Sequence, residues 1–161
     1  MKTIILYATK YGAAQEIAGR IADGIKNGAA DETCVIQKLE KTFPSLEDFD
    51  RVILGSSVYA GSIRKEAKKF LAKNEGILQD KILGLFLSGI GTDEKDTYFK
   101  SNFSENLLRK AKAKSFLGGV FDPKKANFIE RCIIKAVAKQ SARIDTINDK
   151  KIGKFAEAMK A

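Results

Sequence analysis

The chain has 161 residues, of which 44% are hydrophobic, and this length suits one domain with a full core. It contains no histidine, which excludes histidine-based acid–base catalysis, histidine metal sites and Ser-His triads. The net charge of +9 lies in residues 109–154, which hold 13 Lys and Arg against 4 Asp and Glu, so this third of the chain should attract anions unless it is only a solvated surface.

The first 25 residues predict a strand, a tight turn and a helix. Thr3–Ala8 is a short apolar run with β-branched residues, typical of a buried strand. A helix is predicted by apolar residues at three-and-four spacing, namely Ile17, Ala18, Ile21, Ala22 and Ile25. The turn between them consists of Thr9, Lys10, Tyr11, Gly12, Ala13 and Ala14. Backbone N–H groups and the helix dipole meet there, which predicts a phosphate site; the alternative is an ordinary strand–helix unit without a ligand.

The rest of the chain alternates strands and helices. Strands are predicted at Thr33–Gln37, Arg51–Ser56, Lys81–Ser88 and Ser115–Val120. Helices are predicted at Ile63–Asn74, Asp96–Ala113, Asn127–Lys139 and Asp149–Lys160. This alternation predicts a single α/β domain over residues 1–161, with a doubly wound, five-stranded parallel sheet and helices on both faces. In that fold, ligands bind at the carboxyl ends of the strands, where the winding reverses.

Two further loops follow strands at that predicted edge. The first consists of Ser57, Val58, Tyr59, Ala60 and Gly61. The second consists of Ser88, Gly89, Ile90 and Gly91. Small residues let backbone approach a ligand closely, and Tyr59 could stack on a planar ring. Together with the phosphate turn, they predict a mononucleotide with a large planar ring, although loops after strands are also small and polar for steric reasons alone.

The two cysteines and the late basic segment carry weaker expectations. Cys34 and Cys132 lack metal-ligand spacing, and we expect both to be reduced core residues. The predicted helix Asn127–Lys139 has an apolar stripe with basic residues beside it, so it either packs on the domain or lies on an anionic membrane surface. No run approaches the roughly 20 residues of a transmembrane helix, so a soluble, cytoplasmic protein is expected. Nucleic acid is not an expected partner.

Three segments carry a resemblance to the flavodoxin family. They are ILYATKYGAAQEIA, FDRVILGSSVYAGSIRKEAKKFL and FLGGVFDPKKANFIERCIIKAVAK, and within the family the chain is most similar to the branch that includes menaquinone-dependent protoporphyrinogen oxidases. The resemblance implies a flavodoxin-like fold and non-covalently bound FMN. It places Thr9, Gly12, Ala13 and Ala14 at the FMN phosphate, with Lys10 and Tyr11 in the same loop. It places residues 57–61 and 88–91 on either side of the isoalloxazine ring.

The chain departs from the family pattern in two respects. The family usually has Ser or Thr where Ala14 stands, and often a polar residue where Ala13 stands, so two phosphate ligands are missing. Electron-carrier flavodoxins are acidic, whereas this chain is basic, so its partner is expected to have an acidic or anionic surface. The resemblance also implies that a peptide in the loop Tyr59-Ala60-Gly61 tunes the flavin.

Three functions therefore remain open from the sequence. The chain is an FMN-binding protein that transfers electrons to a redox partner protein or a quinone, with no catalytic side chain required. It is alternatively a quinone-dependent protoporphyrinogen oxidase, in which Lys124, Lys125 and Arg131 could pair with propionates and the protein would touch the inner face of the membrane. Or it is a flavodoxin-like binding module that has lost FMN.

Overall fold

The computed structural model describes residues 1–27, 31–91, 95–127, 131–132 and 143–160. Its main sheet has the order β2-β1-β3-β5-β6, and all pairings along this path are parallel. These strands are β1 (Lys2–Ala8), β2 (Thr33–Lys38), β3 (Arg51–Tyr59), β5 (Ile82–Ser88) and β6 (Ala113–Phe116). The predicted doubly wound five-stranded parallel sheet is confirmed, and β4 (Ser62–Ile63) adds a short antiparallel sixth strand beside β3.

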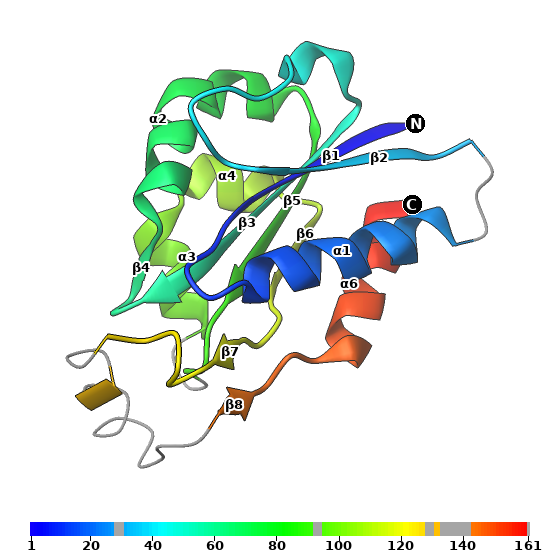
Figure 1. The fold of residues 1–161 in the computed structure, drawn as a ribbon. Coiled ribbons are helices and arrows are strands. Elements are labelled where there is room, and N and C mark those ends of the chain that lie inside the picture. The colour runs from blue at the N-terminus through cyan, green and yellow to red at the C-terminus, as the bar shows by residue number, and fades with distance from the viewer. Residues whose placement is uncertain (28–30, 92–94, 128–130, 133–142, 161) are drawn as a thin grey trace.

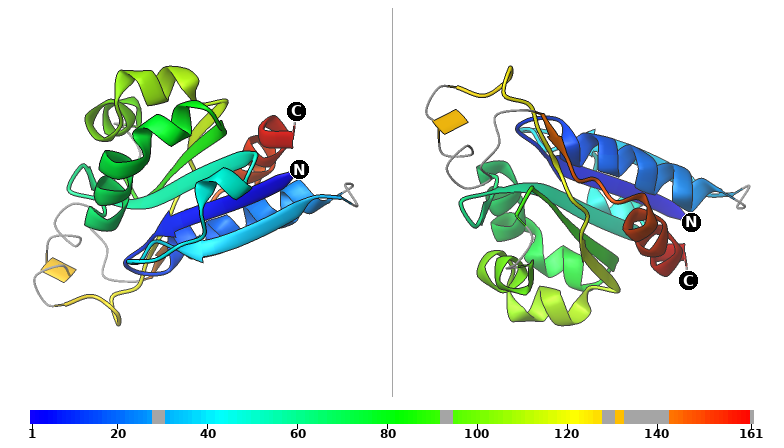
Figure 2. Two further views of the ribbon diagram at one scale, coloured as in Figure 1. Left: turned by 90° about the horizontal axis from the view of Figure 1, so that it is seen from above. Right: turned by 90° about the horizontal axis from the view of Figure 1, so that it is seen from below.

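Helices cover both faces of this sheet (Figures 1 and 2). One face carries α1 (Ala13–Lys26) and α6 (Asp149–Lys160), which pack on each other and on β1, β3 and β5. The other face carries α2 (Lys65–Gln79), α3 (Lys95–Asn102) and α4 (Glu105–Lys110). Because both faces are covered, the central strands are apolar throughout and nearly inaccessible to solvent.

The charged residue Arg51 stands in the core at the opposite edge of the sheet from the carboxyl ends. It is 0% exposed, and its Nη1 atom donates to Thr3 Oγ1 at 2.8 Å and to Glu32 Oε2 at 3.1 Å. These contacts tie the first residues of β1 and β3 to the segment that leads into β2. A buried cation of this kind is tolerated because it is paired and hydrogen-bonded.

The predicted helix Asp96–Ala113 is wrong as one helix, because the chain breaks it at Phe103 and Ser104. Ser104 is the N-cap of α4, and its hydroxyl accepts from the Leu107 N–H at 3.3 Å and also contacts Glu75. A serine in this position satisfies a free N–H group only at a helix start, so it favours two short helices over one long one. Helix α2 likewise begins at Lys65 rather than Ile63. Ile63 belongs to β4, where it pairs with Val58 of β3.

The fifth strand is also shorter than predicted and is followed by a small separate sheet. The chain leaves the main sheet after Phe116 and forms β7 (Val120–Phe121), which pairs antiparallel with β8 (Ile144–Asp145). Gly118 has φ +83°, and a Cβ atom there would lie 1.9 Å from the Thr146 carbonyl oxygen. This close approach requires glycine and ends the strand. A 3₁₀ turn at Leu46–Asp48 (η1) precedes β3.

Two predictions from the basic third of the chain fare differently. The predicted helix Asn127–Lys139 lies mostly outside the described residues. Cys132 is exposed, which corrects its prediction as a core residue, whereas Cys34 is half-buried against the α1–α6 face. Within the described parts of the chain, every helix is too short or too polar to cross a membrane.

Candidate functional site

A narrow cavity of about 70 Å³ lies at the carboxyl ends of β1, β3 and β5. All three sequence-predicted loops contribute to it, together with β7. Its lining residues are Thr9, Tyr11, Ala13, Ser57, Val58, Tyr59, Ser88, Gly89, Ile90, Val120 and Phe121. The carboxyl-end loops therefore converge on one slot, the place where a doubly wound sheet binds its ligands.

Two serine hydroxyls in this cavity have no hydrogen-bond partner. Ser57 and Ser88 are opposite each other on β3 and β5, Ser88 is 1% exposed, and neither Oγ atom has a partner within reach. Ser56, which precedes them, is equally buried but fully used: its Oγ accepts from the Arg64 N–H at 3.0 Å and donates to the Ser57 carbonyl oxygen. A buried hydroxyl without a partner is costly, so these two hydroxyls have hydrogen-bonding capacity that a ligand in the cavity could use.

The turn before α1 leaves the start of the helix without a side-chain cap. Gly12 has φ +94° and caps α1 without any side-chain hydrogen bond, so the first N–H groups of the helix keep their free capacity. The Gly12 N–H itself donates to Thr9 Oγ1 at 3.0 Å, which fixes the turn and points the threonine hydroxyl proton elsewhere. The dipole of a 14-residue helix adds positive potential at this position.

A second hollow of about 270 Å³ adjoins the same turn. Tyr11, Gly12 and Ala13 form one wall, and two cations from the basic third of the chain, Lys125 and Arg143, form another. Glu16 and Asp122 also line it, and Arg143 Nη2 lies 3.9 Å from Asp145. The charge around the turn is therefore mixed, with the cations supplied by segments far along the chain.

Aromatic rings border the slot on its solvent side. Tyr11 packs edge-to-face on Phe121 with ring centroids 6.0 Å apart, and its partial burial raises the pKa of its phenol. Tyr59 is 36% exposed. The Lys10 ammonium lies over both tyrosines, 5.5 Å from the Tyr11 centroid and 5.4 Å from the Tyr59 centroid. Two rings that hold a cation on their faces also offer those faces to a flat ligand ring.

The loop after β3 is a tight hairpin. Tyr59 pairs with Ser62, and the two residues between them, Ala60 and Gly61, have φ angles of 48° and 75°. Positive φ at both central positions is the type I′ turn, and alanine is strained there. The Asn102 amide accepts from the Ile63 N–H and donates to the Gly61 carbonyl oxygen, so α3 anchors the turn.

The remaining predicted site residues lie outside the slot. The Ala14 side chain is 0% exposed and packs on the core side of α1, while its backbone N–H belongs to the first turn of that helix. Gly91 lies against the Tyr98 ring, beyond the slot. Val120 and Phe121 were missed because the sequence placed Val120 inside a longer fifth strand. The signal was available, since the Gly118-Gly119 pair interrupts that strand.

A family model described as "Flavodoxin domain" matches residues 4–147. The chain belongs to the flavodoxin family. A curated relative, protoporphyrinogen IX dehydrogenase [quinone] of Escherichia coli K12, is 24% identical to this chain over 148 residues. The alignment covers 88% of this chain and 81% of the relative.

Solved flavodoxins share the fold. Flavodoxin 2 of Bacillus cereus has a TM-score of 0.62 at 24% identity, covering 99% of this chain and 97% of its own, and flavodoxin 1 of the same organism has 0.61 at 16% identity, with 99% and 97% covered. Rubredoxin oxygen:oxidoreductase of Desulfovibrio gigas has a TM-score of 0.63 at 15% identity; this chain is covered to 99% but spans only 35% of that longer protein.

Membership of the flavodoxin family implies a flavin cofactor, and the residues present fit one. The orphan hydroxyls of Ser57 and Ser88 could hydrogen-bond polar ring atoms. The uncapped start of α1 could hold a terminal phosphate, and there is open space at Gly12, where an added Cβ atom would meet nothing within 4 Å. The site therefore offers a flavin both a polar slot and an anion-binding end.

Proposed function

We propose that this flavodoxin-family protein binds FMN in the slot between the three loops and transfers electrons between redox partners. The observation that carries the proposal is the pair of buried, unpartnered hydroxyls of Ser57 and Ser88 at the junction of those loops. When bound, FMN supplies the one- and two-electron chemistry, and the protein supplies binding and electrostatics.

Each part of the site has a distinct task in this proposal. The Thr9 hydroxyl and the N–H groups of the first turn of α1 hold the phosphate, and Ala13 leaves this work to the backbone. Tyr59 covers one face of the ring system. The strained hairpin at Ala60-Gly61 presents backbone groups to the ring edge, where a change of peptide orientation would alter the potential.

A second candidate function is quinone-dependent oxidation of protoporphyrinogen. It is favoured by the Escherichia coli relative, whose name states that activity and which is aligned over 88% of this chain. With the oxidase function, the electron acceptor is a quinone, and the basic surface would contact an anionic membrane from the cytoplasm. With the electron-transfer function, the basic surface would bind an acidic partner protein. Turnover of protoporphyrinogen IX with a menaquinone analogue separates the two functions.

Fluorescence titration of flavin-free protein with FMN tests the binding proposal. We expect quenching at 1:1 stoichiometry with a Kd below about 10 μM. Riboflavin is the matched control, because it lacks the phosphate and should bind at least about tenfold more weakly. Equal affinities for FMN and riboflavin would contradict the phosphate role of the Thr9–Ala14 turn. An absence of FMN binding would favour the alternative that the protein is a binding module that has lost FMN.

A further inference from the structure

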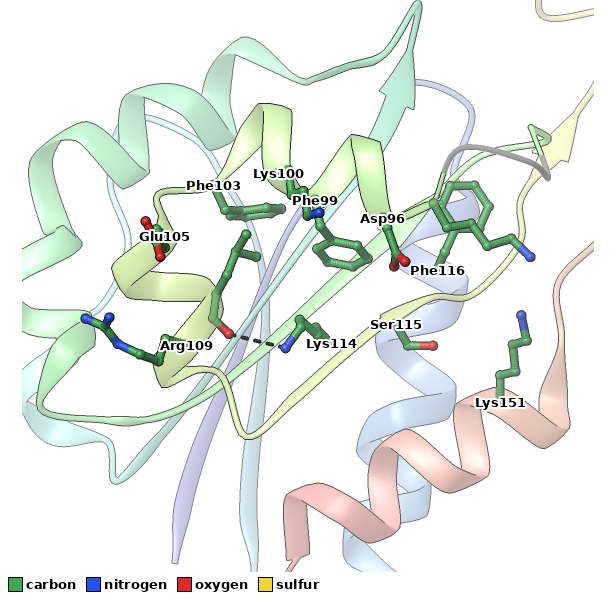
Figure 3. Close-up of a pocket in the computed structure, with 12 residues that line it drawn as sticks. Asp96, Phe99, Lys100, Phe103, Glu105, Arg109, Lys114, Ser115, Phe116 and Lys151 are labelled. Carbon is green, nitrogen blue, oxygen red and sulfur yellow. Dashed lines mark hydrogen bonds between the residues drawn. The ribbon is translucent and has the colours of Figure 1, made fainter.

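A groove of about 930 Å³ lies away from the flavin slot, along the free edge of the main sheet (Figure 3). Strand β6 forms its floor, α3 and α4 form one wall, and the start of α6 forms the other. Its volume falls within the range of small-molecule sites, which is about 300–1,000 Å³. None of the predicted flavin-site residues lines this groove.

The floor and the inner wall of the groove are aromatic. Phe99 and Phe103 are stacked with centroids 5.8 Å apart, and Phe116 of β6 also lines the groove. All three rings are largely buried, so a ligand would meet their exposed edges. Leu108 of α4 extends this apolar strip. A ligand with a flat or extended apolar body could bury its surface along this line.

Two cations from different helices line one end of the groove. Lys95 at the start of α3 and Lys151 of α6 both face it, and burial followed by the charge of Lys95 lowers the pKa of Lys151. Among the described residues, no carboxylate forms an ion pair with either of them. Two ammonium groups side by side repel each other, and an anion between them would turn this repulsion into two charge-assisted hydrogen bonds.

Lys95 is positioned over the aromatic floor. The Lys95 ammonium lies 6.0 Å from the Phe116 ring centroid. An anionic group between Lys95 and Lys151 would therefore place an attached apolar body directly over Phe116 and toward Phe99. Arg109 and Lys114 line the groove further along, while Asp96 and Glu105 are its acids, so cations predominate.

From this arrangement we propose that the groove is a second binding site, which takes a small amphipathic anion: a carboxylate or sulfonate on an aromatic or extended apolar body. The anionic group binds between Lys95 and Lys151, and the apolar body lies on Phe116, Phe99 and Phe103. The Phe116 ring also lies against the loop of residues 88–91, which we call the third flavin loop. A Cβ atom added at Gly89 would lie 3.2 Å from Phe116 Cζ. The two sites are therefore separate but share a wall.

Calorimetric titration with 8-anilinonaphthalene-1-sulfonate tests this site in the full-length protein with saturating FMN present. The dependence of probe binding on Lys95 and Lys151 is measured separately from FMN binding, so a failure of this proposal is distinguishable from a failure of the proposed flavin function. We expect one binding event, which the double variant Lys95→Gln/Lys151→Gln weakens at least about tenfold. Sodium sulfate at the same concentration as the probe should not displace it, because sulfate has no apolar body.

The matched control is Lys41→Gln/Lys73→Gln, which removes the same charge from a different cleft. That cleft, about 880 Å³ between α2 and the loop after β2, is also lined by lysines and by Phe43 and Phe70. The control should keep probe affinity within about twofold of the parent. The proposal is overturned if the parent protein does not bind the probe. It is also overturned if both double variants weaken probe binding equally, or if only the control variant weakens it. Circular dichroism of each variant verifies folding.

Discussion

At the scale of single residues, Ser56 and Ser88 look alike in sequence but differ in the hydrogen bonding of their hydroxyl groups. Both lie in the carboxyl-terminal half of a central strand, Ser56 within β3 and Ser88 at the end of β5, and both are 1% exposed. The Ser56 hydroxyl satisfies the Arg64 N–H, whereas the Ser88 hydroxyl faces the flavin slot without a partner. Removing them should therefore have opposite effects on folding and on binding.

We predict that Ser88→Ala leaves the flavin-free protein equally stable, or up to about 1 kcal/mol more stable, while weakening FMN binding by about two- to tenfold. The matched control Ser56→Ala should cost about 1–3 kcal/mol of stability and leave FMN affinity unchanged. Urea unfolding and FMN titration of both variants provide the check. A loss of stability in Ser88→Ala without a loss of affinity would show that its hydroxyl has a structural partner instead.

The two cysteines differ in exposure and should differ in reactivity. Burial raises the pKa of the Cys34 thiol from 9.0 to about 11, and Cys132 is exposed. At pH 8 we expect iodoacetamide to alkylate Cys132 at least about tenfold faster than Cys34, as followed by peptide mass spectrometry. Because the Cys34 pKa rises on folding, its contribution to stability is present below pH 9 and is lost as the pH rises through about 11. Equal alkylation rates would contradict the burial of Cys34.

At the scale of elements, the Gly118-Gly119 corner joins three parts of the site. The Gly89 N–H donates to the Gly118 carbonyl oxygen at 3.1 Å, and the Thr146 N–H donates to the Gly119 carbonyl oxygen at 2.8 Å. The third flavin loop, β7 and the segment after β8 therefore depend on one another's positions. No side chain fits at Gly118, because φ is positive and the Thr146 backbone is in the way.

We predict that Gly118→Ala destabilises the protein by about 3 kcal/mol or more and also weakens FMN binding, because the corner must shift the loop at Gly89. Gly153→Ala is the control: it lies on the surface of α6 with open space around it and should be neutral or stabilising by up to about 1 kcal/mol. Thermal unfolding measures both. Unchanged stability in Gly118→Ala would contradict the backbone contact.

The Arg51–Glu32 pair fixes the opposite edge of the sheet. Because Arg51 is 0% exposed, Glu32→Gln should leave a buried charge poorly compensated and cost about 3 kcal/mol of stability. Asp149→Asn, which removes a partner of the exposed Arg20, should cost less than about 1 kcal/mol. Urea unfolding of both variants tests the difference, and similar costs would show that Arg51 is held by Thr3 and not by Glu32.

The presence of the strands was predictable at this scale, but their ends and the helix break were not: β3 runs on to Tyr59, so residues 57–59 of the predicted loop belong to the strand. Apolar runs fixed the order and place of β1, β3 and β5, and their carboxyl-end loops meet as expected. The periodicity of residues 96–113 hid the break at Ser104, because the two short helices pack apolar residues on the same face and only the cap separates them. The hairpin at Ala60-Gly61 was hidden as well, since alanine at positive φ gives no turn signal.

At the scale of the whole molecule, segments distant in sequence converge on each functional feature. Lys125, Arg143 and Phe121 reach the phosphate turn from the late part of the chain, and Lys151 meets Lys95 across the groove. The sequence showed that the positive charge is concentrated in residues 109–154. Only the tertiary structure shows that some of these cations line the hollow beside the turn before α1 and others line the groove. The Ala14 side chain faces the core because that face of α1 packs on the sheet, and the place that the family resemblance gives Ala14 at the phosphate stays a prediction for its backbone N–H.

The most direct test of the FMN site is an absorbance spectrum of the purified protein after incubation with FMN and desalting. We predict flavin bands near about 370 and 450 nm that remain with the protein at close to one flavin per chain. The same treatment of Ser88→Ala should retain less flavin than that of Ser56→Ala. A colourless protein at micromolar concentration would contradict the site and, with it, the proposed role in electron transfer.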